Sequence, residues 1–165
     1  GISRENMAGL LLKDESAFAP CTAQAVMEMC HFYNIPLAGK EVCILGRSLV
    51  VGRPLSILMT NEDATVTACH SKTANLKEVT KRADVLVCCM GRAKAIGSSY
   101  CKEGATVIDV GTNWDEQGNQ VGDVDFDTMA TVAGKISPVP RGLGAVTTAV
   151  LAKQLLKAYR LQEKG

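Results

Sequence analysis

The sequence has 165 residues, of which 47% are hydrophobic and 21% charged, a composition typical of one soluble globular domain with a proper core. Its 18 Lys and Arg against 17 Asp and Glu leave a net charge of +1, which argues against nucleic acid or an anionic membrane as a bulk partner. No apolar run approaches the roughly 20 residues that span a bilayer, and Gly1 to Asn6 is too polar for a signal peptide, so we expect a cytoplasmic protein.

Short apolar runs alternate with helical patterns after residue 20. Thr22 is placed to cap a first helix, which Ile35-Pro36 would end, and Asn75 with Glu78 resembles a capping box for a later helix. In chain order the remaining predictions are a strand at 41–45, a helix through 55–59, a strand at 64–69, a helix from 75 to about 82, strands at 84–89 and 105–110, a short strand or hairpin return at 120–124, a brief strand at 134–137 and a helix at about 145–159. Such buried strands separated by helices predict an α/β, Rossmann-like, doubly wound and mostly parallel sheet with helices on both faces.

A glycine turn follows the first predicted strand and opens a helix. In a doubly wound sheet, ligands bind beyond the carboxyl ends of the strands. Gly46 permits a tight turn, Ser48 offers a hydroxyl, and the helix N-terminus attracts a phosphate. The spacing is G-x-S-x-x-x-G and not the usual G-x-G-x-x-G. Two interpretations therefore stay open: a nucleotide-binding turn that uses Gly46, Arg47 and Ser48, or a strand-to-helix connection with a packing glycine.

The end of the second predicted strand bears on the choice of nucleotide. NAD-selective sites place an Asp or Glu about 20 residues after the glycine turn, where it holds the ribose hydroxyl. Here the chain reads Cys-His-Ser-Lys-Thr at residues 69–73, with no carboxylate to repel a 2′-phosphate. Arg47, Ser71 and Lys72 can bind such a phosphate, which favours NADP. His70 is either a cofactor contact or a loop histidine bonded to the backbone, and Lys72 is alternatively a solvated side chain.

The seven cysteines are an odd number and form no C-x-x-C pair. Several stand inside apolar runs, which predicts small buried hydrophobic residues in a reducing compartment. Because neither His31 nor His70 stands at ligand spacing from the thiols, we expect no metal site.

Over nearly all of residues 6–160 the sequence resembles the methylenetetrahydrofolate dehydrogenase/cyclohydrolase family. The motifs that carry the resemblance are Pro20-Cys21-Thr22, Gly46-Arg47-Ser48 with Val51-Gly52 and Pro54, and the stretches 64–73, 104–111, 121–124 and 138–140 with Gly142 and Gly144. The resemblance implies enzymes that oxidise 5,10-methylenetetrahydrofolate by hydride transfer to NADP and then hydrolyse the methenyl product to 10-formyltetrahydrofolate. It also implies a homodimer and a place in one-carbon metabolism and purine biosynthesis.

By match of position, the resemblance assigns residues of this chain to two groups. The cofactor contacts by match of position would be Gly46, Arg47, Ser48 and Ser71, with Thr112 as a backbone contact. His70 is added as a cofactor candidate because of its place at the end of the second predicted strand. The loop at 140–148 would border the folate cleft between two domains, and its substrate-side residues would be Pro140, Arg141, Gly142, Leu143, Gly144 and Thr147.

Two departures from the family pattern stand out. The family has Gly-Ile-Asn where this chain has Gly111-Thr112-Asn113, so a cofactor contact at Thr112 would use its backbone. The family loop reads Pro-Gly-Gly, whereas here Arg141 follows Pro140. If that position needs a positive φ, an arginine there costs about 1 kcal/mol or more, and its side chain is placed to narrow the cleft or to reach a substrate carboxylate.

The family's catalytic Lys and its neighbouring Tyr belong to a preceding domain. We therefore expect residues 1–19 to be a connecting segment, residues 20–165 to be the NAD(P)-binding domain, and the chain to hold no catalytic residue and to be inactive alone. Asp109 and Asp123 fall at strand ends, where capping or turn roles are predicted. The alternative is a stand-alone nucleotide-binding module without catalysis. The hairpin at 115–124 is a candidate dimer edge, and tetrahydrofolate derivatives are the expected partners.

Overall fold

The computed structural model describes residues 1–163 and shows there a five-stranded parallel sheet in the order β2-β1-β3-β4-β7. A two-stranded antiparallel sheet, β5–β6, stands apart from it. The strands are β1 (Glu41–Leu45), β2 (Thr65–Cys69), β3 (Val85–Cys88), β4 (Thr106–Asp109), β5 (Asn113–Trp114), β6 (Gln120–Val121) and β7 (Lys135–Ile136). The order reverses between β1 and β3, as in doubly wound sheets, which confirms the predicted fold class.

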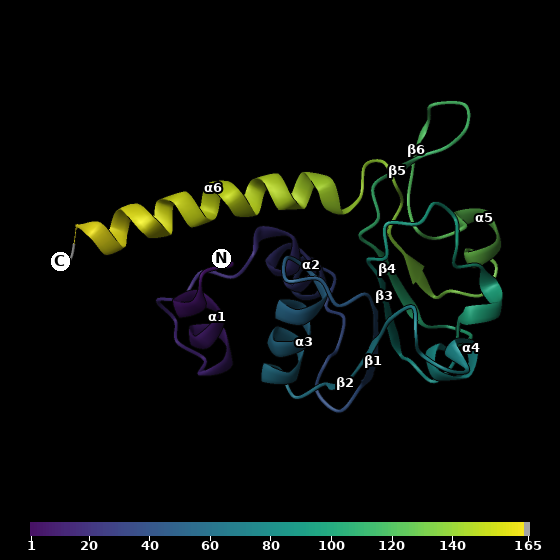
Figure 1. Cartoon of the computed structure of the whole chain (residues 1–165), viewed down its shortest axis with the longest axis horizontal. Coiled ribbons are helices and arrows are strands. Elements are labelled where there is room, and N and C mark those ends of the chain that lie inside the picture. The colour runs from purple at the N-terminus through teal and green to yellow at the C-terminus, as the bar shows by residue number, and fades with distance from the viewer. Residues whose placement is uncertain (164–165) are drawn as a thin grey trace.

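Helices cover both faces of the sheet (Figure 1). They are α1 (Arg4–Leu11), α2 (Cys21–Phe32), α3 (Gly52–Asn61), α4 (Leu76–Thr80), η1 (Ser98–Tyr100), α5 (Phe126–Met129) and α6 (Leu143–Gln162). One core joins α2, α3 and the start of α6 to the sheet through residues such as Val26, Ile44 and Met59. The other joins the α4 and α5 face through residues such as Leu86, Ile96 and Met129.

The predicted cap at Thr22 is wrong, and the predicted cap at Asn75 has the right position but lacks the capping hydrogen bond. α2 begins at Cys21 behind Pro20, so Thr22 lies inside the helix and not at its N-cap. Asn75 precedes α4 with φ +50 and ψ +43, and its side chain makes no capping hydrogen bond within the described residues. A capping side chain needs an extended backbone, which the left-handed conformation of Asn75 does not supply.

The last helix is longer than predicted, and the apolar face that the sequence pattern predicts for it, which includes Leu151 and Leu155, is only partly covered. α6 runs from Leu143 to Gln162, and the side chains of Leu151 and Leu155 are 52% and 65% exposed. Figure 1 shows the reason: the helix passes over α2 and continues beyond the sheet toward α1. Only its first turns therefore pack into the core.

The expected connecting segment 1–19 contains a helix that the sequence analysis did not predict. Ser3 Oγ accepts a hydrogen bond from the backbone N–H of Asn6 and caps α1. The α1 end then bonds to α3, because Lys13 Nζ donates to the carbonyl of Asn61 at 3.0 Å and Asn61 Nδ2 donates to the carbonyl of Leu10 at 2.8 Å. At the other end of the chain, residues 164 and 165 of the predicted domain 20–165 lie outside the described residues.

The cysteines are free thiols, and within residues 1–163 five of them are buried, as expected, while Cys21 and Cys89 are half-buried. Burial raises the pKa of Cys89 to about 12. Within the same residues, no three His, Cys, Asp or Glu side chains gather as metal ligands. No helix in this part of the chain is long and apolar enough to cross a bilayer.

We expect native protein at pH 8 to be alkylated rapidly by iodoacetamide at Cys21 alone. The thiolate is the nucleophile, and a rise in the pKa of Cys89 from its usual value to about 12 lowers its thiolate fraction about a thousandfold. Intact-mass spectrometry against time counts the adducts, and urea should release all seven sites. Rapid addition of two or more groups to the native protein would contradict the buried positions of the other thiols.

Candidate functional site

Three strand ends meet where the order of the sheet reverses. Leu45 at the end of β1 stands in register with Cys69 of β2 and Cys88 of β3. Beyond them the backbone N–H of Gly46 donates to the carbonyl of Cys69, and that of Cys89 donates to the carbonyl of Leu45, each at 2.9 Å. The crevice at such a point is where doubly wound sheets bind ligands.

The glycine turn fits this crevice only because Gly46 and Gly52 carry no side chains. Gly46 has φ +137, and a Cβ there would overlap the carbonyl of Cys89 and lie 2.7 Å from its Sγ. A Cβ on Gly52, the first residue of α3, would overlap the carbonyl oxygen of Gly46 and lie 2.6 Å from its carbonyl carbon. The packing interpretation of these glycines is therefore correct, and it leaves the nucleotide-binding interpretation open, because a bare turn lets a ligand approach the backbone.

Arg47 and Ser48 are exposed on this turn, just before the N-terminus of α3. Ser48 Oγ accepts a hydrogen bond from the backbone N–H of Val51 at 3.1 Å. Its own proton is then directed to another acceptor, since a hydroxyl both accepts and donates. The turn thus offers a cation, a hydroxyl and a helix N-terminus to an anion.

The end of β2 is a closed turn. The backbone N–H of His70 donates to Thr73 Oγ1 at 2.9 Å, and that of Lys72 donates to Nδ1 of the His70 ring at 3.1 Å. The backbone therefore occupies Nδ1, as one of the two interpretations of this histidine expected, and a cofactor contact by His70 would have to use Nε2. Ser71 and Lys72 are exposed on the same turn.

Two buried aspartates organise the end of β4. Asp109 is 3% exposed, and its carboxylate accepts the backbone N–H groups of Gly111, Asp123 and Val124 at 2.9–3.0 Å. Burial raises the pKa of Asp109, although those three hydrogen bonds act in the opposite direction. The Asp123 carboxylate accepts the backbone N–H groups of Gly91 and Arg92 in the turn after β3, so the predicted turn role of both aspartates is confirmed. Thr112 lies exposed in the turn that they hold.

The loop that the resemblance assigned to the substrate side leaves the end of β7, at the same edge of the sheet. The peptide bond between Val139 and Pro140 is cis, and Arg141 has φ +72, so the positive φ expected there is confirmed, at a cost of about 1 kcal/mol. A Cβ on Gly142 would overlap the carbonyl of Pro138. Arg141 and Gly142 line a cleft of about 790 Å³ that β4, β7 and the end of α2 complete.

The loop is shorter than predicted. Leu143, Gly144 and Thr147 belong to the first turns of α6, because the helix begins at Leu143 and not near Ala145. Thr147 Oγ1 donates to the carbonyl of Leu143 at 3.1 Å, a bond within the helix. Of these three residues, Leu143 is buried in the core, Gly144 is exposed and Thr147 is half-buried.

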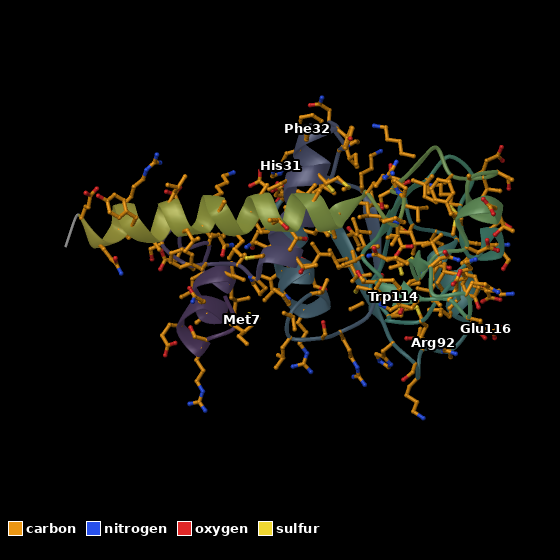
Figure 2. The ribbon with its side chains drawn as sticks, turned by 90° about the horizontal axis from the view of Figure 1, so that it is seen from above. Met7, His31, Phe32, Arg92, Trp114 and Glu116 are labelled. Carbon is orange, nitrogen blue, oxygen red and sulfur yellow. The ribbon has the colours of Figure 1, made fainter. Side chains whose placement is uncertain are left out.

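The turn after β3, formed by Met90, Gly91 and Arg92, was not among the predicted site residues. It begins one residue after Cys89, which the glycine turn contacts. Figure 2 shows Arg92 at the same end of the molecule as Trp114, which follows β4. The sequence contained a signal for this turn, because it directly follows a predicted strand and ligands bind beyond the carboxyl ends of such strands.

The sequence model of the family described as "Tetrahydrofolate dehydrogenase/cyclohydrolase, NAD(P)-binding domain" matches residues 20–163. The chain belongs to this family. The resemblance drawn from the motifs is thus confirmed, and the matched residues include the glycine turn, the end of β2 and the loop after β7.

Comparison with individual members of the tetrahydrofolate dehydrogenase/cyclohydrolase family supports this membership in both sequence and structure. The chain is 52% identical over 157 residues to the bifunctional protein FolD of Clostridioides difficile, an alignment that covers 95% of this chain and 55% of that protein. The crystal structure of FolD from Campylobacter jejuni superimposes with a TM-score of 0.95 at 39% identity, covering 98% of this chain and 57% of the other. FolD of Trypanosoma brucei, solved with NADP and an inhibitor, gives 0.92 at 35% identity, covering 99% and 58%. The chain thus spans little more than half the length of these relatives.

Proposed function

We propose that this chain is the NADP-binding domain of a bifunctional enzyme that oxidises 5,10-methylenetetrahydrofolate to the methenyl form and hydrolyses that product to 10-formyltetrahydrofolate. The observation that carries the proposal is the bare glycine turn at the reversal point of the sheet, beside a β2 end without a carboxylate. Both reactions belong to a protein longer than this chain, with residues 1–19 as the connection to its other domain.

The site fits a dinucleotide phosphate. Gly46 and Gly52 leave room for backbone approach, and the α3 N-terminus with Ser48 suits the pyrophosphate. Arg47 and Ser71 are exposed at adjacent strand ends, where a 2′-phosphate would lie. NADP, when bound, accepts the hydride. Thr112, through its backbone, and His70, through Nε2, complete the proposed contacts.

The folate side is assigned to the loop after β7 and the start of α6. We place Pro140, Arg141, Gly142, Leu143, Gly144 and Thr147 along the folate cleft, with the Arg141 guanidinium available to a substrate carboxylate. The carboxylate oxygens of Asp109 and Asp123 accept hydrogen bonds from backbone N–H groups, so neither carboxylate is free to act as a general acid or base. We therefore expect no turnover by the 165 residues alone, and we propose that the catalytic Lys and Tyr come from the other domain of a cytoplasmic homodimer active in one-carbon metabolism.

Calorimetric titration of the chain with NADP and NAD tests the nucleotide assignment. We expect binding of both nucleotides with a preference for NADP. Arg47→Ala should weaken NADP binding by about 10- to 100-fold, because a hydrogen bond to a charged group contributes about 1.5–3 kcal/mol, and should leave NAD binding nearly unchanged.

Arg160→Ala is the matched control, because Arg160 is an exposed arginine in the last turn of α6, far from the end of β1 in Figure 1. It should change neither affinity by more than about twofold, since a solvated charge contributes little. If the unmodified chain binds neither nucleotide, the proposed function is wrong. If Arg47→Ala weakens NAD and NADP equally, the 2′-phosphate assignment is wrong.

A further inference from the structure

Asp123 is fully buried, and both oxygens of its carboxylate accept hydrogen bonds. It accepts hydrogen bonds from the backbone N–H groups of Met90, Gly91 (3.1 Å) and Arg92 (2.8 Å). Nδ2 of Asn113 donates a fourth bond at 2.9 Å. One side chain thus holds three consecutive amides of the turn after β3 and the first residue of β5.

The segment that carries Asp123 is itself fixed to β4. The Asp109 carboxylate accepts the backbone N–H groups of Asp123 at 3.0 Å and Val124 at 2.9 Å. Backbone bonds from Lys94 to the carbonyl of Gly122 and from Ile96 to that of Asp123, each 3.0 Å, extend the contact with the β3 turn. Residues 122–124 therefore couple the turn after β3 to the turn after β4.

The three ion pairs found within residues 1–163 involve neither aspartate. The Asp123 carboxylate is therefore stabilised by amide dipoles, which offset the cost of burying it. An asparagine would fit poorly, because its NH₂ group would face donors in place of an acceptor oxygen. The geometry thus requires a carboxylate at this position.

The turn that Asp123 holds borders the second half of a dinucleotide site. In the proposed site the β1 and β2 ends would serve one nucleotide half, because the strand order reverses there, and the β3, β4 and β7 ends would serve the other. Met90 follows Cys89, against which Gly46 packs. The turns at 90–92 and 111–113 lie just beyond the carboxyl ends of β3 and β4.

We propose that Asp123 is a positioning residue that preforms the nicotinamide half of the cofactor site by fixing the backbone of Met90, Gly91 and Arg92. This inference rests on the proposed function. It predicts that loss of the carboxylate weakens only those ligands that reach across the reversal point.

The test compares two ligands on Asp123→Asn in the full chain. NADP occupies both halves, whereas adenosine 2′,5′-bisphosphate occupies only the half served by β1 and β2. Calorimetry should show about a tenfold loss of NADP affinity, a loss typical of a disturbed hydrogen bond to a charged group, and a change of less than about twofold for the bisphosphate. Asp115→Asn is the matched control: Asp115 accepts the N–H groups of Gln117 and Asn119 in the β5–β6 hairpin, and neither affinity should change.

Equal weakening of both ligands, or of neither, would overturn the inference, while failure of the unmodified chain to bind either ligand would overturn the proposed function instead. Two measurements on the unmodified chain apply even if Asp123→Asn does not fold. The amides of Gly91 and Arg92, in exposed residues, should be protected from hydrogen exchange, and NADP but not the bisphosphate should shift the amide resonances of residues 90–92. Unprotected amides, or resonances that NADP leaves unmoved, would show that Asp123 does not fix this part of the site.

Discussion

Replacing Gly46 by alanine should lower the affinity of the chain for NADP about a hundredfold and destabilise the fold by about 3 kcal/mol. The new Cβ would overlap the carbonyl of Cys89 and stand 2.7 Å from its Sγ, at a φ of +137 that L-residues rarely adopt. Overpacking costs about 1–3 kcal/mol, and backbone strain adds about 1–3 kcal/mol. If the turn moves to relieve the overlap, Arg47 and Ser48 move with it, and each 1.4 kcal/mol lost is about tenfold in affinity. Calorimetry with NADP and urea unfolding measure the two effects.

Gly39→Ala is the matched control for backbone strain. Gly39 has φ +71, and no described heavy atom lies within 4 Å of a Cβ built there. Alanine at that position should reduce the free energy of unfolding by about 1 kcal/mol and leave the affinity for NADP unchanged. If Gly46→Ala binds NADP as tightly as the unmodified chain, the glycine turn does not approach the cofactor and the proposed site is wrong.

The strands were the most predictable part of the fold. β1 and β3 lie inside the sheet, and the four residues of β3 are all buried. A strand covered on both faces reads as a continuous apolar run, which is how residues 42–45 and Val85–Cys88 appear in the sequence. The edge strand β2 mixes exposed threonines with the buried Cys69 and was found mainly from its place in the alternation of strands and helices.

The helix ends and the exposed face of α6 were not predictable from local pattern. Asn75 has the residue type of a cap, but tertiary structure places it in the left-handed region. Leu151 and Leu155 stand where periodicity predicts an apolar face, yet both are exposed. Periodicity shows which residues share a face of a helix, and it does not show what covers that face.

The candidate site likewise has one part that local sequence predicts and one part that depends on the tertiary structure. The glycine turn is a local feature, since Gly46, Ser48 and Gly52 lie within seven residues and their chemistry can be read from spacing. The three backbone partners of Asp123 lie 31–33 residues earlier in the chain, and only the strand order brings them together. A strand-end aspartate could be assigned a turn role from sequence, but the turn that it holds could not be identified.

Gly122→Ala should destabilise the protein by about 4 kcal/mol or more, a large share of the 5–15 kcal/mol typical of a domain. Its Cβ would overlap Asp109 Oδ2 and lie 2.5 Å from Cγ, in a place where both residues are buried. If the Asp109 side chain moves to relieve this overlap, the buried N–H groups of Gly111, Asp123 and Val124 lose their acceptor, at a cost of about 1–3 kcal/mol each. If residues 122–124 move instead, the Asp123 carboxylate is pulled away from the turn after β3.

Urea unfolding of Gly122→Ala beside Gly118→Ala separates the clash from the effect of removing a glycine. Gly118 stands at the hairpin tip with φ +80 and no described heavy atom within 4 Å of a built Cβ, so alanine there should cost about 1 kcal/mol. The difference between the two variants measures what the buried aspartate network contributes to stability. A loss for Gly122→Ala no larger than that for Gly118→Ala would show that residues 122–124 relax freely around a methyl group, which the hydrogen bonds converging on Asp109 and Asp123 should prevent.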